Sequence, residues 1–172
     1  MAQDPASVES DLRPTVLVIG MGDTGVLTAG HLSRHCRVIG VTTKPVLVSG
    51  QELGLRLTEH AQWRRNYLIP LAHYRRLSRV EVIHGRAVRI DPVAQTASLE
   101  LASGEQRSLI WDYLVIASGV SNGFWRDDRL DTYGVIESRL ASQRAAVTAA
   151  NSIAVVGGGP SGTSAAFNLK RA

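Results

Sequence analysis

Apolar and polar residues change their spacing along this chain, and these changes predict its elements. Residues 15–20 are a short aliphatic run, typical of a strand buried on both faces of a parallel sheet. Residues 24–36 then place apolar side chains at mostly helical spacing, and residues 37–41 form a second aliphatic run. This order predicts a strand–helix–strand unit of about thirty residues.

The middle of the chain mixes two strand patterns. Residues 80–84 and 112–117 are aliphatic and predict further buried strands, the first of them ending at the conformationally free Gly85. Apolar and polar residues alternate in three stretches separated by turn sequences, 86–90, 96–101 and 108–110. We therefore predict an α/β fold with three layers, in which one central parallel sheet contains residues 15–20 and 112–117 and a small antiparallel meander covers residues 86–110.

The remaining segments are less regular. Residues 44–63 read as loop plus a short helix, and residues 64–77 as helical on both sides of Pro70. Residues 131–150 predict a helix, and the aliphatic run at 152–156 predicts another strand followed by a helix. Residues 1–13 are polar, lack the apolar core of a signal peptide and are expected to be a disordered tail.

Composition narrows the class of protein. With 172 residues, 44% of them hydrophobic and 20% charged, the chain can form one full globular domain with little left for a second. The net charge of +4 comes from scattered arginines, which favours surface ion pairs or an anionic cofactor over nucleic acid. No apolar run is long enough to cross a bilayer. The single cysteine suits a reducing cytoplasm, where we expect the protein, and the positive charge leaves peripheral contact with an acidic membrane surface open.

Cysteine and histidine indicate no metal or disulfide chemistry. Cys36 is the only cysteine of the sequence and is expected to be a packed small residue. The five histidines do not have metal-ligand spacing, and we predict no metal site. The aromatic segment 123–126 is expected to be a packed linker, or else a ring beside a cofactor or a quinone substrate.

Two glycine-rich sequences carry the functional signal. Gly20-Met21-Gly22-Asp23-Thr24-Gly25 and Gly157-Gly158-Gly159-Pro160-Ser161-Gly162 each follow an aliphatic run and open a predicted helix. In such a turn the first glycine permits the tight bend, the second lets backbone approach a pyrophosphate, and the third lets the helix pack on the sheet. Two such turns predict two dinucleotide sites, hence a protein that moves electrons between two cofactors.

Between these turns, residues 111–119 read WDYLVIASG. The three motifs in this order resemble the two-dinucleotide-binding flavoproteins, in particular type II NADH dehydrogenases and apoptosis-inducing-factor-like reductases. The resemblance covers about residues 14–172 and implies a Rossmann-like FAD-binding domain at 14–120, a linker and helix at 121–150, and the start of a truncated NAD(P)-binding domain at 151–172.

The resemblance also implies which residues bind which cofactor. FAD would be bound by the first turn, by the end of the second strand, by a residue of the adenine-contacting strand and by the second flavin motif: Gly20, Gly22, Asp23, Thr24, Gly25, Thr42, Thr43, Lys44, Ala87, Ala117, Ser118 and Gly119. NAD(P)H would be bound by the second turn: Gly157, Gly159, Pro160, Ser161 and Gly162. Within the first set, the pyrophosphate is expected at residues 22–25 and the adenosine end toward residues 42–44.

The chain departs from the family in three ways. The second strand usually ends in an acid that binds the adenosine ribose, but here Thr42 and Thr43 stand there, and Lys44 could instead lie over a phosphate. The glutamate that usually follows the second glycine motif is replaced by Thr163 and Ser164. The family's C-terminal segments have no counterpart, so we expect an N-terminal fragment that is inactive alone.

The resulting hypothesis is an FAD-dependent NAD(P)H oxidoreductase whose acceptor is a quinone-like molecule or a redox protein rather than a disulfide, because no cysteine pair is present. It names no catalytic residue and expects a homo-oligomer. Two alternatives stay open. A nicotinamide-only dehydrogenase would carry no flavin, and a non-catalytic nucleotide-binding module would not be part of a larger enzyme.

Overall fold

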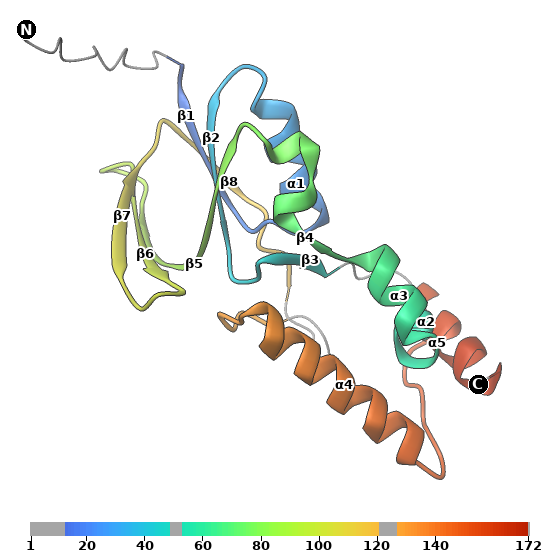
Figure 1. The fold of residues 1–172 in the computed structure, drawn as a ribbon. Coiled ribbons are helices and arrows are strands. Elements are labelled where there is room, and N and C mark those ends of the chain that lie inside the picture. Colours follow the sequence, from blue (N-terminus) through green and yellow to red (C-terminus); the bar gives the residue numbers. More distant parts are fainter. Residues whose placement is uncertain (1–12, 49–52, 121–126, 172) are drawn as a thin grey trace, which may run out of the picture.

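The computed structural model describes residues 13–48, 53–120 and 127–171. Its centre is a curled six-stranded sheet with the strand order β7-β6-β5-β2-β1-β8 (Figure 1). The strands are β1 (Thr15–Ile19), β2 (Arg37–Thr42), β5 (Val80–Asp91), β6 (Thr96–Leu101), β7 (Gln106–Ile110) and β8 (Tyr113–Ile116).

Strand β1 lies between two parallel neighbours. Leu17 is in register with Ile39 on β2 and with Leu114 on β8. The predicted placement of the first and the last aliphatic runs in one sheet is therefore confirmed. Val16, Leu17 and Val18 are buried because both faces of this strand are covered, which explains why the sequence is aliphatic without alternation.

Three layers build the domain, as predicted. Helix α1 (Asp23–Leu32) and the turns after residue 70 cover one face of the sheet, where Val18, Val26 and Leu77 belong to one buried cluster (Figure 1). The antiparallel β5–β7 meander curls over the other face, where Leu17, Leu99 and neighbouring side chains form a second cluster. Helix α1 ends at Leu32, four residues earlier than the sequence predicts.

The prediction of two separate strands on either side of Gly85 is wrong. Strand β5 runs without a break from Val80 to Asp91. Its first half pairs in parallel with β2 and its second half antiparallel with β6. Gly85 is needed for a close approach, because a Cβ there would lie 2.9 Å from the carbonyl oxygen of Glu100. One strand thus joins the parallel sheet to the meander.

A second small sheet replaces part of the predicted loop and helix. Strands β3 (Val46–Val48) and β4 (Leu68–Pro70) pair antiparallel, with Leu47 opposite Ile69. Two short 3₁₀ turns follow, at Leu71–His73 and Arg75–Leu77. The expectation of helix on both sides of Pro70 is met only in part, because α-helix ends at Tyr67 before the strand and only short 3₁₀ turns follow it. The apolar residues at 68–71 lie in a strand and a tight turn, where Leu68 and Leu71 are buried.

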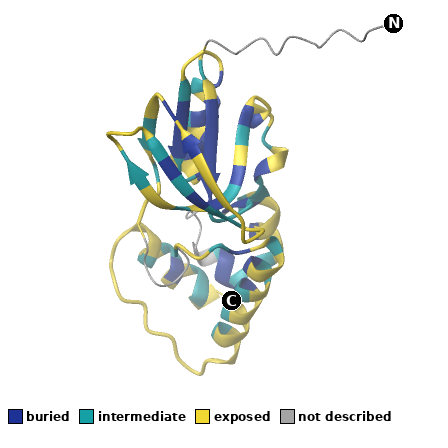
Figure 2. Cartoon of the chain, turned by 90° about the vertical axis from the view of Figure 1, so that its left-hand side faces the viewer, coloured by how far each residue is buried: buried dark blue, intermediate teal, exposed yellow. Residues whose placement is uncertain are grey.

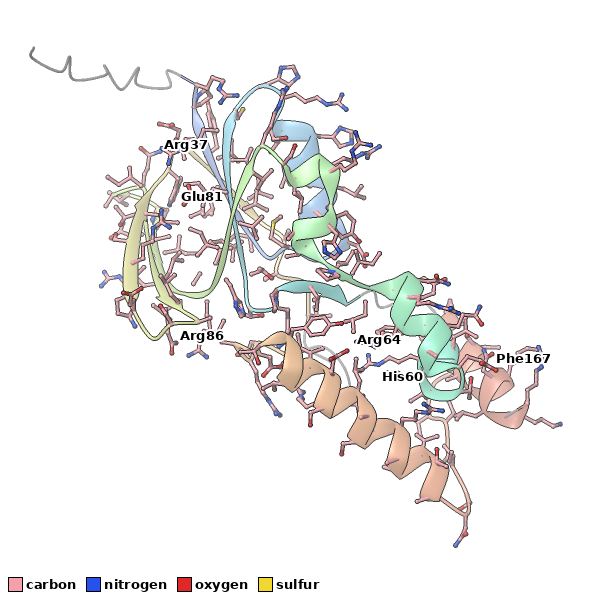
Figure 3. The ribbon with its side chains drawn as sticks, in the orientation of Figure 1. Arg37, His60, Arg64, Glu81, Arg86 and Phe167 are labelled. Carbon is pink, nitrogen blue, oxygen red and sulfur yellow. The ribbon has the colours of Figure 1, made fainter. Side chains whose placement is uncertain are left out.

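Helices form the other part of the molecule: α2 (Leu53–Thr58), α3 (His60–Tyr67), α4 (Tyr133–Ala149) and α5 (Pro160–Arg171). Helix α5 packs against α2, and Arg64 on α3 forms a salt bridge with Glu137 on α4, as the position of Arg64 in Figure 3 illustrates. Trp63 is fully buried in the small cluster that α2, α3 and α4 share with β3 and β4. Much of the outer surface of this part is exposed (Figure 2).

The aliphatic run at residues 152–156 does not form the predicted strand. Its neighbour in chain order, helix α5, is present, but no described strand pairs with this run. Val156 is 97% exposed. A strand requires hydrogen-bonding partners beside it, and sequence pattern alone cannot supply them.

Candidate functional site

The first glycine turn brings three backbone segments into close contact. Gly20 has a φ of +97°, and a Cβ there would lie 2.5 Å from the carbonyl oxygen of Ala117. A Cβ on Gly25 would lie 1.8 Å from the carbonyl oxygen of Gly20. Only glycine fits these two positions, because the end of β1, the first turn of α1 and the segment after β8 meet there. Gly25 therefore acts in packing, behind the candidate site.

Gly22 differs from these two glycines. A Cβ there would meet no described atom within 4 Å, and its φ of −76° is open to any residue. Gly22 instead leaves room in front of helix α1, whose start carries no side-chain cap. Backbone N–H groups at an uncapped helix start attract anions, and the helix dipole adds to the effect. The turn can thus receive a phosphate group at Gly22, Asp23 and Thr24.

Residues 117–119 continue from β8 beside this turn. The N–H of Ala117 donates to the carbonyl of Ile19 over 2.8 Å, which extends the pairing between β8 and β1 by one residue. Gly119 has a φ of +70°, so the chain turns away immediately afterwards. Two motifs separated by nearly a hundred residues in the sequence therefore form one continuous edge.

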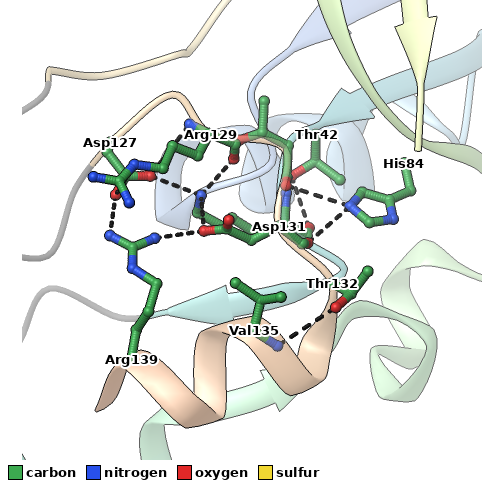
Figure 4. Close-up of polar contacts among 10 residues, drawn as sticks. Thr42, His84, Asp127, Arg129, Asp131, Thr132, Val135 and Arg139 are labelled. Carbon is green, nitrogen blue, oxygen red and sulfur yellow. Dashed lines mark hydrogen bonds and ion pairs between the residues drawn. The ribbon is translucent and has the colours of Figure 1, made fainter. Parts of the chain in front are cut away.

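At the end of β2, the side chains are already engaged by other protein groups. The Thr42 hydroxyl donates to the carbonyl of Lys44 over 2.9 Å and accepts from its N–H. The Lys44 ammonium contacts Asp127 Oδ1 at 2.9 Å, Asp131 Oδ2 at 2.9 Å and the Arg129 carbonyl at 2.6 Å (Figure 4). An ammonium has three hydrogens to donate. All three hydrogens of the Lys44 ammonium are therefore donated to protein oxygens, which leaves none for the phosphate contact that the sequence suggested.

The segment after residue 126 borders the end of β2 and the middle of β5. The N–H of Asp131 donates to the Thr43 carbonyl over 3.1 Å. His84 Nε2 lies 3.3 Å from that carbonyl and 3.1 Å from the carbonyl of Asp131. Both partners are acceptors, so Nε2 carries the hydrogen. Arg139 on α4 binds Asp127 and Asp131 and closes the cluster (Figure 4).

This cluster determines the ionisation of Asp127. Burial alone would raise the pKa of this carboxyl group. Hydrogen bonds from Arg139 and Lys44 act in the opposite sense and hold the pKa well below its ordinary value. Asp127 is therefore a charged, structurally engaged carboxylate at neutral pH.

These segments enclose a single cavity of about 590 Å³. It opens between the first glycine turn, the end of β2, the middle of β5, the segment after β8 and the segment after residue 126. Every predicted flavin-site residue except Gly25 lines it: Gly20, Gly22, Asp23, Thr24, Thr42, Thr43, Lys44, Ala87, Ala117, Ser118 and Gly119. The structure thus brings together residues that four separate parts of the sequence contribute.

Sequence reasoning missed part of the lining. Arg86, Asp127 and Asp128 also face this cavity. The two carboxylates come from an irregular segment between a motif and a helix, where no periodicity or spacing links them to β2. Only the absence of an acid at the end of β2 could have prompted a search for one elsewhere. The aromatic segment 123–126 lies outside the described residues.

The second glycine turn has the same local geometry as the first. Gly157 has a φ of +111°, and a Cβ on Gly162 would lie 1.9 Å from its carbonyl oxygen. Gly159 is open, and Pro160 and Ser161 begin helix α5. Residues 151–161 are all exposed, however, and none of them lines the cavity described above. The second glycine turn is formed, and its assignment to NAD(P)H stays a prediction.

Cys36 is half-buried, packs against the cluster under α1 and lies outside the cavity lining. Among the described residues, no three His, Cys, Asp or Glu side chains gather as metal ligands would. Within the same residues, no helix combines the length and the apolar character that crossing a membrane requires.

Comparison with known proteins gives one family. A model described as pyridine nucleotide-disulphide oxidoreductase matches residues 14–172. No curated protein is significantly similar. Among solved structures, the water-forming NADH oxidase of Lactobacillus brevis bound to NADH is 20% identical with a TM-score of 0.64, covering 91% of this chain and 37% of that one.

Two further structures are similar to the chain. NDH2 from Plasmodium falciparum in complex with RYL-552 is 11% identical with a TM-score of 0.63, covering 91% of this chain and 36% of that one. The sulfide:quinone oxidoreductase of Aquifex aeolicus is 23% identical with a TM-score of 0.55, covering 79% and 33%. At these identities the likeness shows the fold, and the chain spans about a third of the length of these structures.

Proposed function

The chain belongs to the pyridine nucleotide-disulphide oxidoreductase family, whose cofactors are FAD and NAD(P)H, and we propose that its cavity is the FAD site of an NAD(P)H oxidoreductase. In this proposal a hydride passes from reduced nicotinamide to the flavin, and the electrons pass on to an acceptor that is not a disulfide. We propose further that the chain acts as the N-terminal part of a longer enzyme, since it spans about a third of the structures it resembles.

One observation supports the FAD site above the others. The glycine turn, the end of β2, Ala87 and residues 117–119 converge on one cavity of about 590 Å³. Its volume lies in the range of pockets that bind small molecules and cofactors. In an open parallel sheet, ligands bind outside the carboxyl ends of the strands, where the strand order reverses. The cavity lies at those ends, and β2 and β8 flank β1 there.

The residues present fit the group. Gly22 leaves the space before α1 open, and a side chain there would fill it. The uncapped start of α1 supplies backbone donors for a pyrophosphate. Ala87 on β5 is small enough to border a planar ring, and Ser118 and Gly119 border the far side. FAD would therefore extend across the edge formed by β2, β1 and β8.

When bound, the flavin supplies the ring that takes up the hydride and releases the electrons to the acceptor. The contribution of this chain is binding and orientation. The first turn of α1 would hold the pyrophosphate by backbone donors, and the tight contact of Gly20 with Ala117 fixes the distance between the end of β1 and the segment after β8. We assign no general acid or base to the described residues.

The proposal that the electron acceptor is not a disulfide rests on the position of Cys36. This cysteine packs against the core under α1 and is not part of the cavity lining. Transfer to a disulfide requires a reactive cysteine pair beside the flavin. A quinone or a redox protein fits the chain better. Among the structurally similar proteins are a sulfide:quinone oxidoreductase and a putidaredoxin reductase in complex with putidaredoxin.

Two measurements test the proposal. The purified chain is titrated with FAD, and flavin fluorescence reports binding. NADH and NADPH oxidation are then followed with a soluble quinone and with a disulfide substrate as acceptors. Weak flavin binding is expected for this chain, and any turnover of the longer protein should favour the quinone. A chain that binds NADPH but no flavin would instead be a nicotinamide-only dehydrogenase.

A further inference from the structure

The adenosine end of the cavity lacks a carboxylate where β2 would place one. Dinucleotide sites of this kind bind a ribose through an Asp or Glu that accepts hydrogen bonds from its hydroxyl groups. Strand β2 ends at Thr42, and the residues that follow are Thr43 and Lys44. The Thr42 hydroxyl is used within its own turn, and the Lys44 ammonium is held by two aspartates.

Two carboxylates reach this end of the cavity from another part of the chain. Asp127 and Asp128 both line it. Asp127 is not available to a ligand, because Lys44 and the Arg129 N–H occupy its Oδ1 and Arg139 binds its Oδ2. Asp128 is exposed to solvent and makes no hydrogen bond or ion pair with any described residue. Its carboxylate is therefore free to accept hydrogen bonds.

The neighbouring contacts hold Asp128 at the adenosine end rather than at the phosphate turn. Asp127 is tied to Lys44, which follows β2, and the Asp131 N–H is bound to the Thr43 carbonyl. On the other side, Arg86 on β5 also lines the cavity. Its pKa is raised, chiefly by the hydrogen bond and charge of Glu100 and further by the charge of Asp128. Asp128 thus lies near the end of β2 and the middle of β5.

We propose that Asp128 accepts hydrogen bonds from the adenosine ribose hydroxyls of the dinucleotide in this cavity, in place of the acid that β2 lacks. This inference rests on the proposed FAD site. It also predicts that the site distinguishes a ribose with a 2′-phosphate from one without. A ribose that carries a 2′-phosphate would meet the charge of Asp128 beside Asp127. The two cations nearby are already engaged, since Lys44 donates to three protein oxygens and Arg86 is paired with Glu100. The first site should therefore take an unphosphorylated ribose.

The test compares Asp128→Asn with Glu105→Gln in the 172-residue chain. Glu105 is an exposed carboxylate at the β6–β7 turn and lies outside the cavity lining, so its replacement controls for the change in net charge. FAD and FMN are titrated by flavin fluorescence, because FMN lacks the adenosine. We expect Asp128→Asn to weaken FAD binding about tenfold or more, since hydrogen bonds to charged groups are among the strong ones. FMN binding should stay unchanged.

Each outcome decides the matter. Unchanged FAD affinity in Asp128→Asn, with FAD bound by the unaltered chain, overturns the ribose contact and leaves the FAD site standing. An equal loss in Glu105→Gln, or an equal loss for FMN, would also contradict it, because the effect would then be one of overall charge or folding. If the unaltered chain binds FMN and FAD equally, adenosine makes no contact and the inference fails. If neither this chain nor the longer protein binds flavin, the proposed function itself is refuted.

Discussion

The ammonium of Lys44 lies 2.9 Å from a carboxylate oxygen of Asp131, 87 residues later in the chain. The two side chains are only 17% and 8% exposed, so the pair is shielded from solvent. It joins the end of β2 to the segment that precedes α4, and this segment forms one wall of the cavity. The contact therefore links folding of the helical part to the shape of the candidate site.

Lys44→Met should lower the free energy of unfolding by about 2 kcal/mol. It leaves the partly buried Asp131 with Arg139 as its ion-pair partner, and Asp127 with Arg139 and the more distant Arg129. Urea unfolding without any ligand measures this. Lys170→Met is the matched control, since Lys170 is the other lysine of the sequence and is exposed on α5. If both variants unfold like the unaltered chain, and Lys44→Met weakens only flavin binding, Lys44 is a phosphate ligand after all.

Stability should depend on acid pH through Asp127. Its pKa is lower in the folded chain than the ordinary value of 3.8, in spite of burial, because Arg139 and Lys44 donate hydrogen bonds to it. Such a group stabilises the fold above its unfolded pKa, and the stabilisation is lost as pH falls toward the folded pKa. We therefore expect the free energy of unfolding to decrease below about pH 5.

Asp127→Asn should make the free energy of unfolding depend less on pH below about pH 5, and should lower it at neutral pH. Urea unfolding at a series of pH values measures both effects. Glu105→Gln removes an exposed carboxylate elsewhere and should keep the acid dependence of the unaltered chain. If the free energy of unfolding falls equally steeply with acid pH in both variants, other carboxyl groups cause its pH dependence.

The glycines of the first turn should differ in what they tolerate. Gly25→Ala forces a Cβ onto the Gly20 carbonyl oxygen, at 1.8 Å, and should cost at least about 2–3 kcal/mol of folding free energy. Gly22→Ala meets no described atom within 4 Å and should cost about 1 kcal/mol or less, yet weaken FAD binding by filling the phosphate space. Thermal unfolding and flavin titration separate the two effects.

Gly134→Ala is the control for this series. Gly134 lies exposed in the first turn of α4 with open space around it, so alanine should stabilise the helix by about 0.5–1 kcal/mol. Loss of stability in Gly22→Ala as large as in Gly25→Ala would remove the distinction between a packing glycine and a binding glycine.

The sequence predicted the parts of the fold that depend on local pattern. The aliphatic runs of β1 and β8 gave the parallel sheet because a strand buried on both faces has no polar alternation. The glycine spacing indicated the turn that Gly20 and Gly25 build. It could not predict that Gly85 is a point of close approach inside one long strand, because this depends on where the Glu100 carbonyl lies.

Long-range side-chain contacts account for most of what was missed at the site. The engagement of Lys44 by Asp127 and Asp131 follows from the path of the chain after residue 126, which no motif specifies. The small β3–β4 sheet was not predicted, for a similar reason. Each strand has three residues, too few to show an alternating pattern. The strands form by pairing with each other, with Leu47 opposite Ile69, and the sequence does not reveal this pairing.

Arg56 is a buried cation without a carboxylate partner among the described residues. It is 6% exposed, lies 5.4 Å from the Trp63 ring centre and donates to Gln143 over 2.8 Å, while its Nε has no partner. Burial, followed by the charge of Arg139, lowers its pKa to about 10. Arg56→Met should raise the free energy of unfolding by about 1 kcal/mol, because it removes the cost of burying the charge.

Arg65→Met provides the comparison for this prediction. Arg65 is exposed on the same helical part, so its replacement should change stability by no more than about 0.5 kcal/mol. A clear loss of stability in Arg56→Met would mean that the contacts with Trp63 and Gln143 outweigh the cost of desolvation.

Hydrogen exchange should distinguish the two aliphatic runs that precede the glycine turns. Strand β1 is paired on both sides, with β2 and β8, and its amides are expected to be protected to the level of global unfolding. The run at residues 152–156 has no strand partner among the described residues, and Val156 is 97% exposed. Its amides should therefore exchange about as fast as those of an open loop. Peptide-resolved mass spectrometry of the 172-residue chain can compare the two.

The comparison decides how the second glycine turn is supported. Gly157 and Gly162 form the same tight contact as Gly20 and Gly25, so the turn itself does not require a sheet beside it. Binding of NAD(P)H does require such a sheet, because a few backbone hydrogen bonds of about 0.5–1.5 kcal/mol each cannot offset the cost of immobilising a dinucleotide. Fast exchange at residues 152–156 should accompany the absence of micromolar NADH or NADPH binding. Slow exchange there would mean that the run pairs in solution, and nicotinamide binding by this chain would then be expected.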